Sequence, residues 1–144
     1  MTKATRQFQI LLAEDRPEDA ELVRMDLKEH NVQCTLQVIS DDAKAIELIN
    51  GLDSDPNAPP LDLCLVDMHL PKRGGEDILK RLRSTQHYAQ TPVLVMSGIK
   101  APYIEEAAAK HAALVFFQKP STVDEYLRLG SIVQNLLRKR PGAA

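Results

Sequence analysis

The segment covering residues 61–75 reads LDLCLVDMHLPKRGG, and it determines how the rest of the chain can fold. It opens with an apolar run at residues 63–66, which is typical of a strand buried on both faces of a parallel sheet. The run stops at a carboxylate, Asp67. A loop follows, in which Pro71 restricts the backbone and Gly74-Gly75 loosens it. In an open α/β sheet, ligands bind beyond the carboxyl ends of the strands, so we expect Asp67 to carry the chemistry.

Four other segments have the character of β-strands. Three are short apolar runs, and the fourth alternates apolar and polar residues (CTLQVI), which predicts an edge strand with one wet face. In chain order the four segments are residues 8–13, 34–39, 92–96 and 114–117, the second being the alternating one.

The segments between the strands have helical character. Pro17 suits a first helical turn, where Glu18 and Asp19 face the positive end of the helix dipole. The second helix is capped by one of residues 40–42 and closes at Gly51. Ser121 or Thr122 caps the last helix. The predicted helices are residues 16–30, 43–50, 76–83, 103–111 and about 122–139.

Strands that alternate with helices predict a parallel sheet covered on both faces. We therefore expect a flavodoxin-like, doubly wound α/β fold with five strands in the order 2-1-3-4-5 and five helices. The 144 residues suit one domain spanning residues 1–144, with its folded part at about 7–139.

The bulk composition is that of an ordinary globular protein. Hydrophobic residues make up 44% of the chain and charged residues 26%, and the net charge of −2 gives no reason to expect binding to nucleic acid or membranes. The N-terminus lacks the apolar core of a signal peptide. Cys34 and Cys64 both lie in predicted strands. We interpret them as small buried apolar residues of a protein in a reducing compartment, in preference to a disulfide. We expect a cytoplasmic protein.

Polar residues with chemical capability follow four of the five predicted strands. The first strand ends at Glu14 and Asp15, the third at Asp67, the fourth at Ser97 and the fifth at Lys119. Carboxylates that lie close together disfavour one another's ionisation, and Mg²⁺, which prefers oxygen ligands, would relieve this. A metal, an ammonium and a hydroxyl around one carboxylate suit an incoming phosphoryl group, with Asp67 as the attacking group.

Four motifs together resemble the receiver domain of two-component response regulators over nearly the whole chain. They are ILLAED at residues 10–15, LCLVDMHLPKRGGEDIL at 63–79, PVLVMSG at 92–98 and FFQKP at 116–120. The segment LPKRGGEDILKRLR, with the proline-rich loop before the third strand, is similar to single-domain regulators paired with phytochrome-type kinases.

The resemblance implies a role for each matching residue. Asp67 would be phosphorylated by a sensor histidine kinase. Mg²⁺ would be held by Glu14, Asp15, Asp67 and the backbone carbonyl of His69. The protein would be a phosphoacceptor signalling module, catalysing only its own phosphorylation and autodephosphorylation, and it would bind no other cofactor.

The resemblance also implies how the phosphorylated state is recognised. Lys119 would bind the phosphoryl oxygens, with a cis bond to Pro120. Ser97 would hydrogen-bond the phosphoryl group, and Phe116 would be the aromatic switch residue that turns inward. Output would pass through contact with a downstream protein, without an output domain, and a homodimer through the fourth helix, fifth strand and fifth helix is a further expectation.

Four positions depart from the commoner family pattern. Glu14 replaces Asp, Ser97 replaces Thr, His69 stands where Asn is frequent, and Phe116 lacks the hydroxyl of Tyr. The departures at Glu14 and His69 support one alternative, a receiver-like adaptor that binds partners independently of phosphorylation.

Two other functions fit the same fold less well. A hydrolase of the haloacid dehalogenase type needs a second Asp two residues after the first, where this chain has His69, and a cap domain, for which there is no room. A flavin carrier needs a phosphate-binding loop after the first strand, and residues 14–19, EDRPED, are anionic there.

Overall fold

The computed structural model describes residues 7–70 and 74–140, and the predicted loop residue Pro71 lies outside them. Five parallel strands form one sheet in the order β2-β1-β3-β4-β5, as the sequence predicts. The alternating segment is an edge strand, as expected. The strands are β1 (Phe8–Ala13), β2 (Cys34–Ile39), β3 (Leu63–Asp67), β4 (Val93–Ser97) and β5 (Val115–Gln118).

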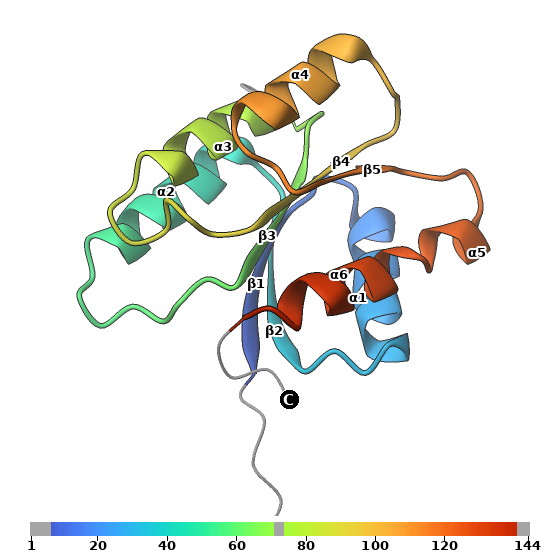
Figure 1. The fold of residues 1–144 in the computed structure, drawn as a ribbon, viewed down its shortest axis with the longest axis horizontal. Helices are drawn as coiled ribbons and strands as arrows, with labels where there is room; N and C mark the ends of the chain where they lie inside the picture. The colour runs from blue at the N-terminus through green and yellow to red at the C-terminus, as the bar shows by residue number, and fades with distance from the viewer. Residues whose placement is uncertain (1–6, 71–73, 141–144) are drawn as a thin grey trace, which may run out of the picture.

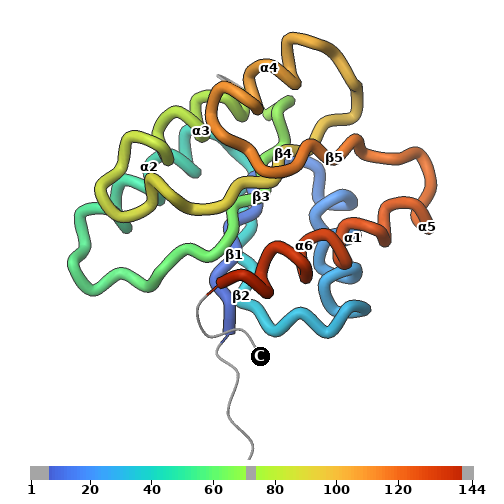
Figure 2. Tube along the Cα trace, viewed as in Figure 1, coloured from blue at the N-terminus to red at the C-terminus, as the bar shows by residue number. Residues whose placement is uncertain are grey.

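Helices cover both faces of the sheet (Figures 1 and 2). One face carries α1, α5 and α6, and the other carries α2, α3 and α4. The helices are α1 (Pro17–Glu29), α2 (Asp42–Asp53), α3 (Gly75–Arg83), α4 (Pro102–Lys110), α5 (Val123–Tyr126) and α6 (Leu129–Leu137).

Two hydrophobic cores lie on the two faces of the central strands. Successive residues of a strand point to opposite faces, so Leu63 and Leu65 enter the core under α1 and α6, whereas Cys64 and Val66 enter the core under α2 and α3. All four are fully buried. The continuous apolar run that predicted a doubly covered strand is therefore explained by two cores sharing one strand.

The helix ends mostly follow their sequence signals. The side chain of Asp41 accepts a hydrogen bond from the amide of Lys44 and caps α2, and Thr122 caps α5 through the amide of Glu125. The predicted stop at Gly51 is wrong, since α2 continues to Asp53. Gly51 is exposed with open space around it, so the helix passes through it, at the modest cost that glycine carries in a helix.

The last predicted helix is divided into two segments, α5 and α6. Tyr126 ends α5, a turn occupies Leu127 and Arg128, and α6 starts at Leu129. Both segments remain on the same side of the sheet as α1 (Figure 1).

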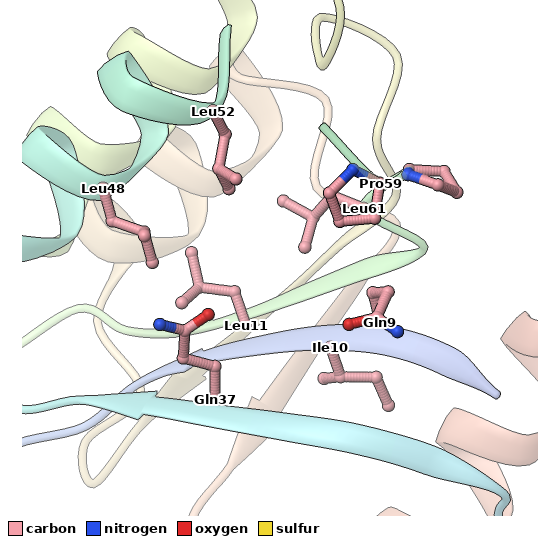
Figure 3. Close-up of a pocket in the computed structure, with 9 residues that line it drawn as sticks. Gln9, Ile10, Leu11, Gln37, Leu48, Leu52, Pro59 and Leu61 are labelled. Atoms are coloured by element: carbon pink, nitrogen blue, oxygen red, sulfur yellow. The ribbon is translucent and has the colours of Figure 1, made fainter. Parts of the chain in front are cut away.

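A small cavity of about 50 Å³ lies between α2 and the edge of the sheet formed by β1 and β2 (Figure 3). Leu48 and Leu52 of α2 face Leu11 across it, and the segment with Pro59 closes one end. That segment is tied to the body of the protein because the Tyr88 hydroxyl donates a 2.9 Å hydrogen bond to the Pro59 carbonyl. None of the described helices is long and apolar enough to span a membrane.

Candidate functional site

The acidic residues expected at the carboxyl edge of the sheet lie together. Glu14 and Asp15 directly follow β1, and Asp67 is the last residue of the neighbouring strand β3. One carboxylate oxygen from each of the three lies within 4.8 Å of the other two. Glu14 and Asp67 are buried, and Asp15 is exposed.

This arrangement fits a divalent cation. Mg²⁺ binds oxygen ligands and usually retains several waters, so it needs only a few protein groups on one side. The exposed Asp15 leaves one side of the cluster open to solvent. Glu14, Asp15 and Asp67 are the residues that could hold the ion, whereas ligation by the His69 carbonyl stays a prediction from resemblance.

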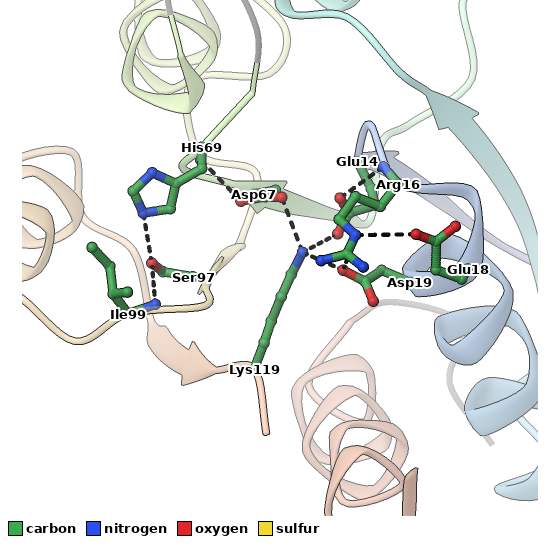
Figure 4. A network of polar contacts seen from close by, with 9 residues as sticks. All are labelled: Glu14, Arg16, Glu18, Asp19, Asp67, His69, Ser97, Ile99 and Lys119. Atoms are coloured by element: carbon green, nitrogen blue, oxygen red, sulfur yellow. Dashed lines mark hydrogen bonds and ion pairs between the residues drawn. The ribbon is translucent and has the colours of Figure 1, made fainter. Parts of the chain in front are cut away.

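Lys119, which follows β5, brings the positive charge. Its ammonium lies 3.0 Å from Oδ2 of Asp67 and 2.9 Å from Oδ2 of Asp19, and it also contacts Glu14 (Figure 4). The Lys119 side chain is only 11% exposed, so these ion pairs are weakly screened by water. Its backbone amide donates to the Ser97 carbonyl at 2.7 Å, which fixes the start of the side chain beside β4.

The local environment separates the acidities of the two buried carboxyl groups. Burial raises the pKa of Glu14 to about 8, against the opposing effect of Lys119. Burial also acts to raise the pKa of Asp67, but the amide of His69, which donates to Oδ1 at 2.9 Å, together with Glu14 and Lys119, holds that pKa below its usual value. Asp67 is therefore the carboxyl group held as an anion, as a nucleophile requires.

A glycine allows the start of α3 to approach Asp67. A Cβ atom at Gly75 would lie 2.6 Å from the Asp67 carbonyl oxygen and 2.8 Å from a methyl carbon of Val66. A side chain there would push α3 away from the strand end. This close approach is the packing reason for Gly75 as the first residue of α3.

Ser97 and His69 contact each other across the mouth of the site. The Ser97 hydroxyl oxygen lies 3.0 Å from Nε2 of His69 and accepts a 3.2 Å hydrogen bond from the amide of Ile99 (Figure 4). Ser97 is fully buried at the end of β4, whereas His69 is exposed. In this state the hydroxyl predicted to meet a phosphoryl group is bonded to the imidazole.

Phe116 and Pro120 complete the predicted set. Phe116 is partly buried on β5, while its neighbour Phe117 is buried in the core and packs edge-on against Tyr126. The expected cis bond between Lys119 and Pro120 is not found, because all described peptide bonds are trans. Trans is the lower-energy form of an X–Pro bond, by about 0.5–1 kcal/mol.

The sequence interpretation missed one residue of the site, Asp19. It assigned Glu18 and Asp19 alike to the helix dipole, yet only Asp19 contacts Lys119 among the contacts of the described residues. The position of Asp19 along the chain gave one indication, because the first turn of the helix after β1 begins at the edge of the sheet where the strands end. Nothing in the local pattern distinguishes Asp19 from Glu18 as a partner of a lysine 100 residues away.

Comparison with known protein families agrees with this geometry. The model of the response regulator receiver domain family matches residues 10–129. A rice protein described as two-component response regulator ORR4 is 27% identical to the chain, covering 98% of this chain and 66% of its own length. Response regulator Rcp1 of Synechocystis is 30% identical over 61% of this chain and 60% of its own length. The chain thus spans somewhat less than two thirds of these relatives.

Solved structures show the same fold. The phosphorylated cyanobacterial phytochrome response regulator RcpA superposes with a TM-score of 0.82 at 20% identity, covering 93% of this chain and 96% of that one. The Mn²⁺-bound form of Rcp1 superposes with a TM-score of 0.81 at 22% identity, covering 95% of this chain and 99% of that one.

Proposed function

The chain belongs to the response regulator receiver domain family, a family of phosphoacceptor signalling modules rather than conventional enzymes, and we propose that Asp67 is its phosphoacceptor. The observation that carries the proposal is the position of Asp67. It lies in one cluster with Glu14 and Asp15 and within 3.0 Å of the Lys119 ammonium. The donor is a phosphorylated histidine of a sensor kinase, and the reaction requires Mg²⁺.

Each residue has a distinct part in the transfer. An oxygen of the Asp67 carboxylate attacks phosphorus; the new P–O bond forms as the bond from phosphorus to the donor imidazole breaks, and that imidazole leaves with the bonding electron pair and takes up a proton. A bound Mg²⁺ would supply charge neutralisation for the carboxylates and the phosphoryl oxygens. Lys119 donates to a phosphoryl oxygen, and Ser97 donates its hydroxyl to another after leaving His69.

The signal leaves the site through protein contact. Ser97 ends β4, and Phe116 lies on the neighbouring strand β5 opposite Val95, two residues before Ser97. Movement of Ser97 toward a phosphoryl group would open space for Phe116 to turn inward, which changes the surface of β5. A groove of about 420 Å³ lined by Phe116, Arg128 and Ile132 already borders that strand. A downstream protein or a second copy of the chain, contacting α4, β5 and α6, is the proposed reader of this change.

The upstream partner is proposed from the relatives. RcpA is described as a phytochrome response regulator, and the LPKRGGEDILKRLR segment points the same way. We take a phytochrome-type histidine kinase as the first donor to test. The alternative is a receiver-like adaptor whose contacts do not depend on phosphorylation.

The test is intact mass after incubation with Mg²⁺ and either acetyl phosphate or a phosphorylated histidine kinase. The expected result is a single phosphoryl adduct on the wild type and on Asp53→Asn, which removes a carboxylate at the end of α2 that bonds the amides of Gln86 and His87. Asp67→Asn and protein treated with EDTA should show none. Absence of an adduct with both donors would overturn the proposal, and loss of Mg²⁺ binding as well would favour the adaptor.

A further inference from the structure

The Lys119 ammonium has no donor to spare in this structure. A lysine ammonium carries three N–H donors. Lys119 contacts three carboxylates, from Glu14 after β1, Asp19 on α1 and Asp67 on β3. A phosphoryl group on Asp67 can therefore gain a Lys119 donor only when one of these carboxylates gives it up.

Asp19 differs from the other two partners. Glu14 and Asp67 belong to the cluster that could hold a metal ion, and Asp19 is not in that cluster among the described residues. A divalent cation at the cluster would share oxygens of Glu14 and Asp67 with the ammonium. Asp19, 2.9 Å from the ammonium, would remain a partner of Lys119 that the cation does not share.

The position of Asp19 is fixed by the fold. Its backbone amide donates to the Arg16 carbonyl at 3.1 Å in the first turn of α1. Its side chain is 14% exposed, and the Arg16 guanidinium that also approaches it is 3.8 Å away and largely exposed. Lys119 is thus the closer and better shielded cation.

We propose that Asp19 is a positioning residue for Lys119, which holds the ammonium between α1 and β3 in the resting state and competes with the phosphoryl group for it. The inference rests on the proposed phosphorylation of Asp67. Neutralising Asp19 frees one N–H donor of the Lys119 ammonium. A phosphoryl group, or an anion that imitates one, therefore binds more tightly. A purely structural ion pair would have the opposite effect, because its loss would leave Lys119 less ordered.

The experiment measures the affinity for beryllium trifluoride, a phosphoryl mimic, at saturating Mg²⁺. The chain has no tryptophan, so binding is followed by calorimetry or by amide NMR shifts. We expect Asp19→Asn to bind the mimic about 3- to 10-fold more tightly than wild type, since an ionised acceptor competes about twice as strongly as a neutral one. Asp19→Glu, which retains the charge, should restore the wild-type affinity.

Glu18→Gln is the matched control. Glu18 is in the same helical turn, and its side chain bonds Arg16 at 3.2 Å rather than Lys119. The Glu18→Gln variant loses the same negative charge close to the site. If the effect needs direct contact with Lys119, its affinity for beryllium trifluoride should stay within about 2-fold of wild type.

The outcomes separate the inference from the proposed function. If wild type and Glu18→Gln bind the mimic but Asp19→Asn binds it equally or more weakly, the role of Asp19 is wrong and phosphorylation of Asp67 stands. Equal tightening in Glu18→Gln and Asp19→Asn would also overturn it, because general charge would then suffice. If wild type binds no mimic and acquires no phosphoryl adduct, the proposed function fails and the inference with it.

Discussion

The backbone amide of Gly130 donates a 2.6 Å hydrogen bond to Oδ2 of Asp26, and this bond joins the start of α6 to α1. The first amides of a helix have no acceptor within the helix. Asp26 is fully buried, and its carboxylate supplies that acceptor from another helix. The buried carboxylate therefore stabilises the start of α6 against α1.

Replacing Gly130 with alanine should destabilise the protein. An added Cβ atom would lie 2.7 Å from Oδ1 of Asp26 and 2.8 Å from its carbonyl oxygen, and it would also meet the His30 ring. We expect the free energy of unfolding to fall by about 1–3 kcal/mol, as overpacking commonly costs, measured by urea denaturation.

Gly51→Ala is the matched control. Gly51 lies inside α2, and nothing lies within 4 Å of the Cβ position. Alanine is the better helix former, so this variant should gain up to about 1 kcal/mol. Equal stability of the two variants would show that α6 does not approach α1 as closely as the structure has it.

Asp26→Asn should become more stable relative to wild type as the pH rises. Burial raises the pKa of Asp26, although the Gly130 amide and His30 partly oppose this. The folded state therefore holds the proton more tightly than the unfolded chain, and wild type loses that stability as the pH rises through the folded-state pKa. Asparagine keeps an acceptor for Gly130 and cannot ionise. Urea denaturation between about pH 3 and pH 7 would show the widening difference.

Asp53→Asn should show the opposite trend. The amide of His87, which donates to Oδ1 of Asp53 at 2.9 Å, and the amide of Gln86 hold the pKa of Asp53 below its usual value. Its ionised form is favoured by folding, so the contribution is present above the unfolded-state pKa and is lost as the pH falls through the folded-state value. The variant should lose stability relative to wild type as the pH rises. If the stability of both variants relative to wild type changed with pH in the same direction, the opposite pKa shifts of Asp26 and Asp53 would be contradicted.

The sequence predicted the sheet well because each strand carries its own evidence. Residues 63–66 are apolar on both faces, and the alternation of β2 marks an edge. The carboxyl ends of parallel strands lie at one edge of the sheet. The sequence alone therefore predicted that Glu14, Asp67 and Lys119 lie close together.

The sequence could not predict features that depend on distant partners. The acceptor for the Gly130 amide at the start of α6 is Asp26, which lies 104 residues earlier. The difference between Asp19 and Glu18 is set by Lys119, which is 100 residues from Asp19. Gly51 carries a strong stop signal, but α2 has open space there and continues, so a local preference of about 1 kcal/mol was outweighed by the rest of the helix.

Arg83→Ala should destabilise the protein strongly. The Arg83 guanidinium donates to four backbone carbonyls, at 2.8 Å to His111, 3.0 Å to Ala89, 2.6 Å to Thr91 and 3.3 Å to Ala112. It thereby joins the end of α3 to the segments that precede β4 and β5. Loss of these charged donors should lower the free energy of unfolding by about 2–4 kcal/mol.

Arg81→Ala provides the comparison for Arg83. Arg81 is exposed on the same helix, and its guanidinium contacts only the side chain of Asn50 among the hydrogen bonds of the described residues. Loss of one exposed contact should stay within about 0.5 kcal/mol of wild type. Similar losses in both variants would mean that helix propensity, rather than the carbonyl contacts, is responsible.

Lys119→Met should destabilise the protein without metal and make it more responsive to Mg²⁺. The variant leaves Glu14, Asp19 and Asp67 without their shared cation. We expect a loss of about 1.5–3 kcal/mol in EDTA, the range for hydrogen bonds to charged groups.

In wild type a metal must compete with the ammonium for oxygens of Glu14 and Asp67, and in the variant it need not. The increase in the unfolding midpoint caused by Mg²⁺ should therefore be larger in the variant, because a ligand that binds only the folded state stabilises it more when its Kd is lower at the same free concentration. Lys100→Met, which removes an exposed lysine 3.9 Å from Glu105, should respond to Mg²⁺ as wild type does. A smaller Mg²⁺ response in Lys119→Met than in wild type would mean that Lys119 assists metal binding rather than competing with it.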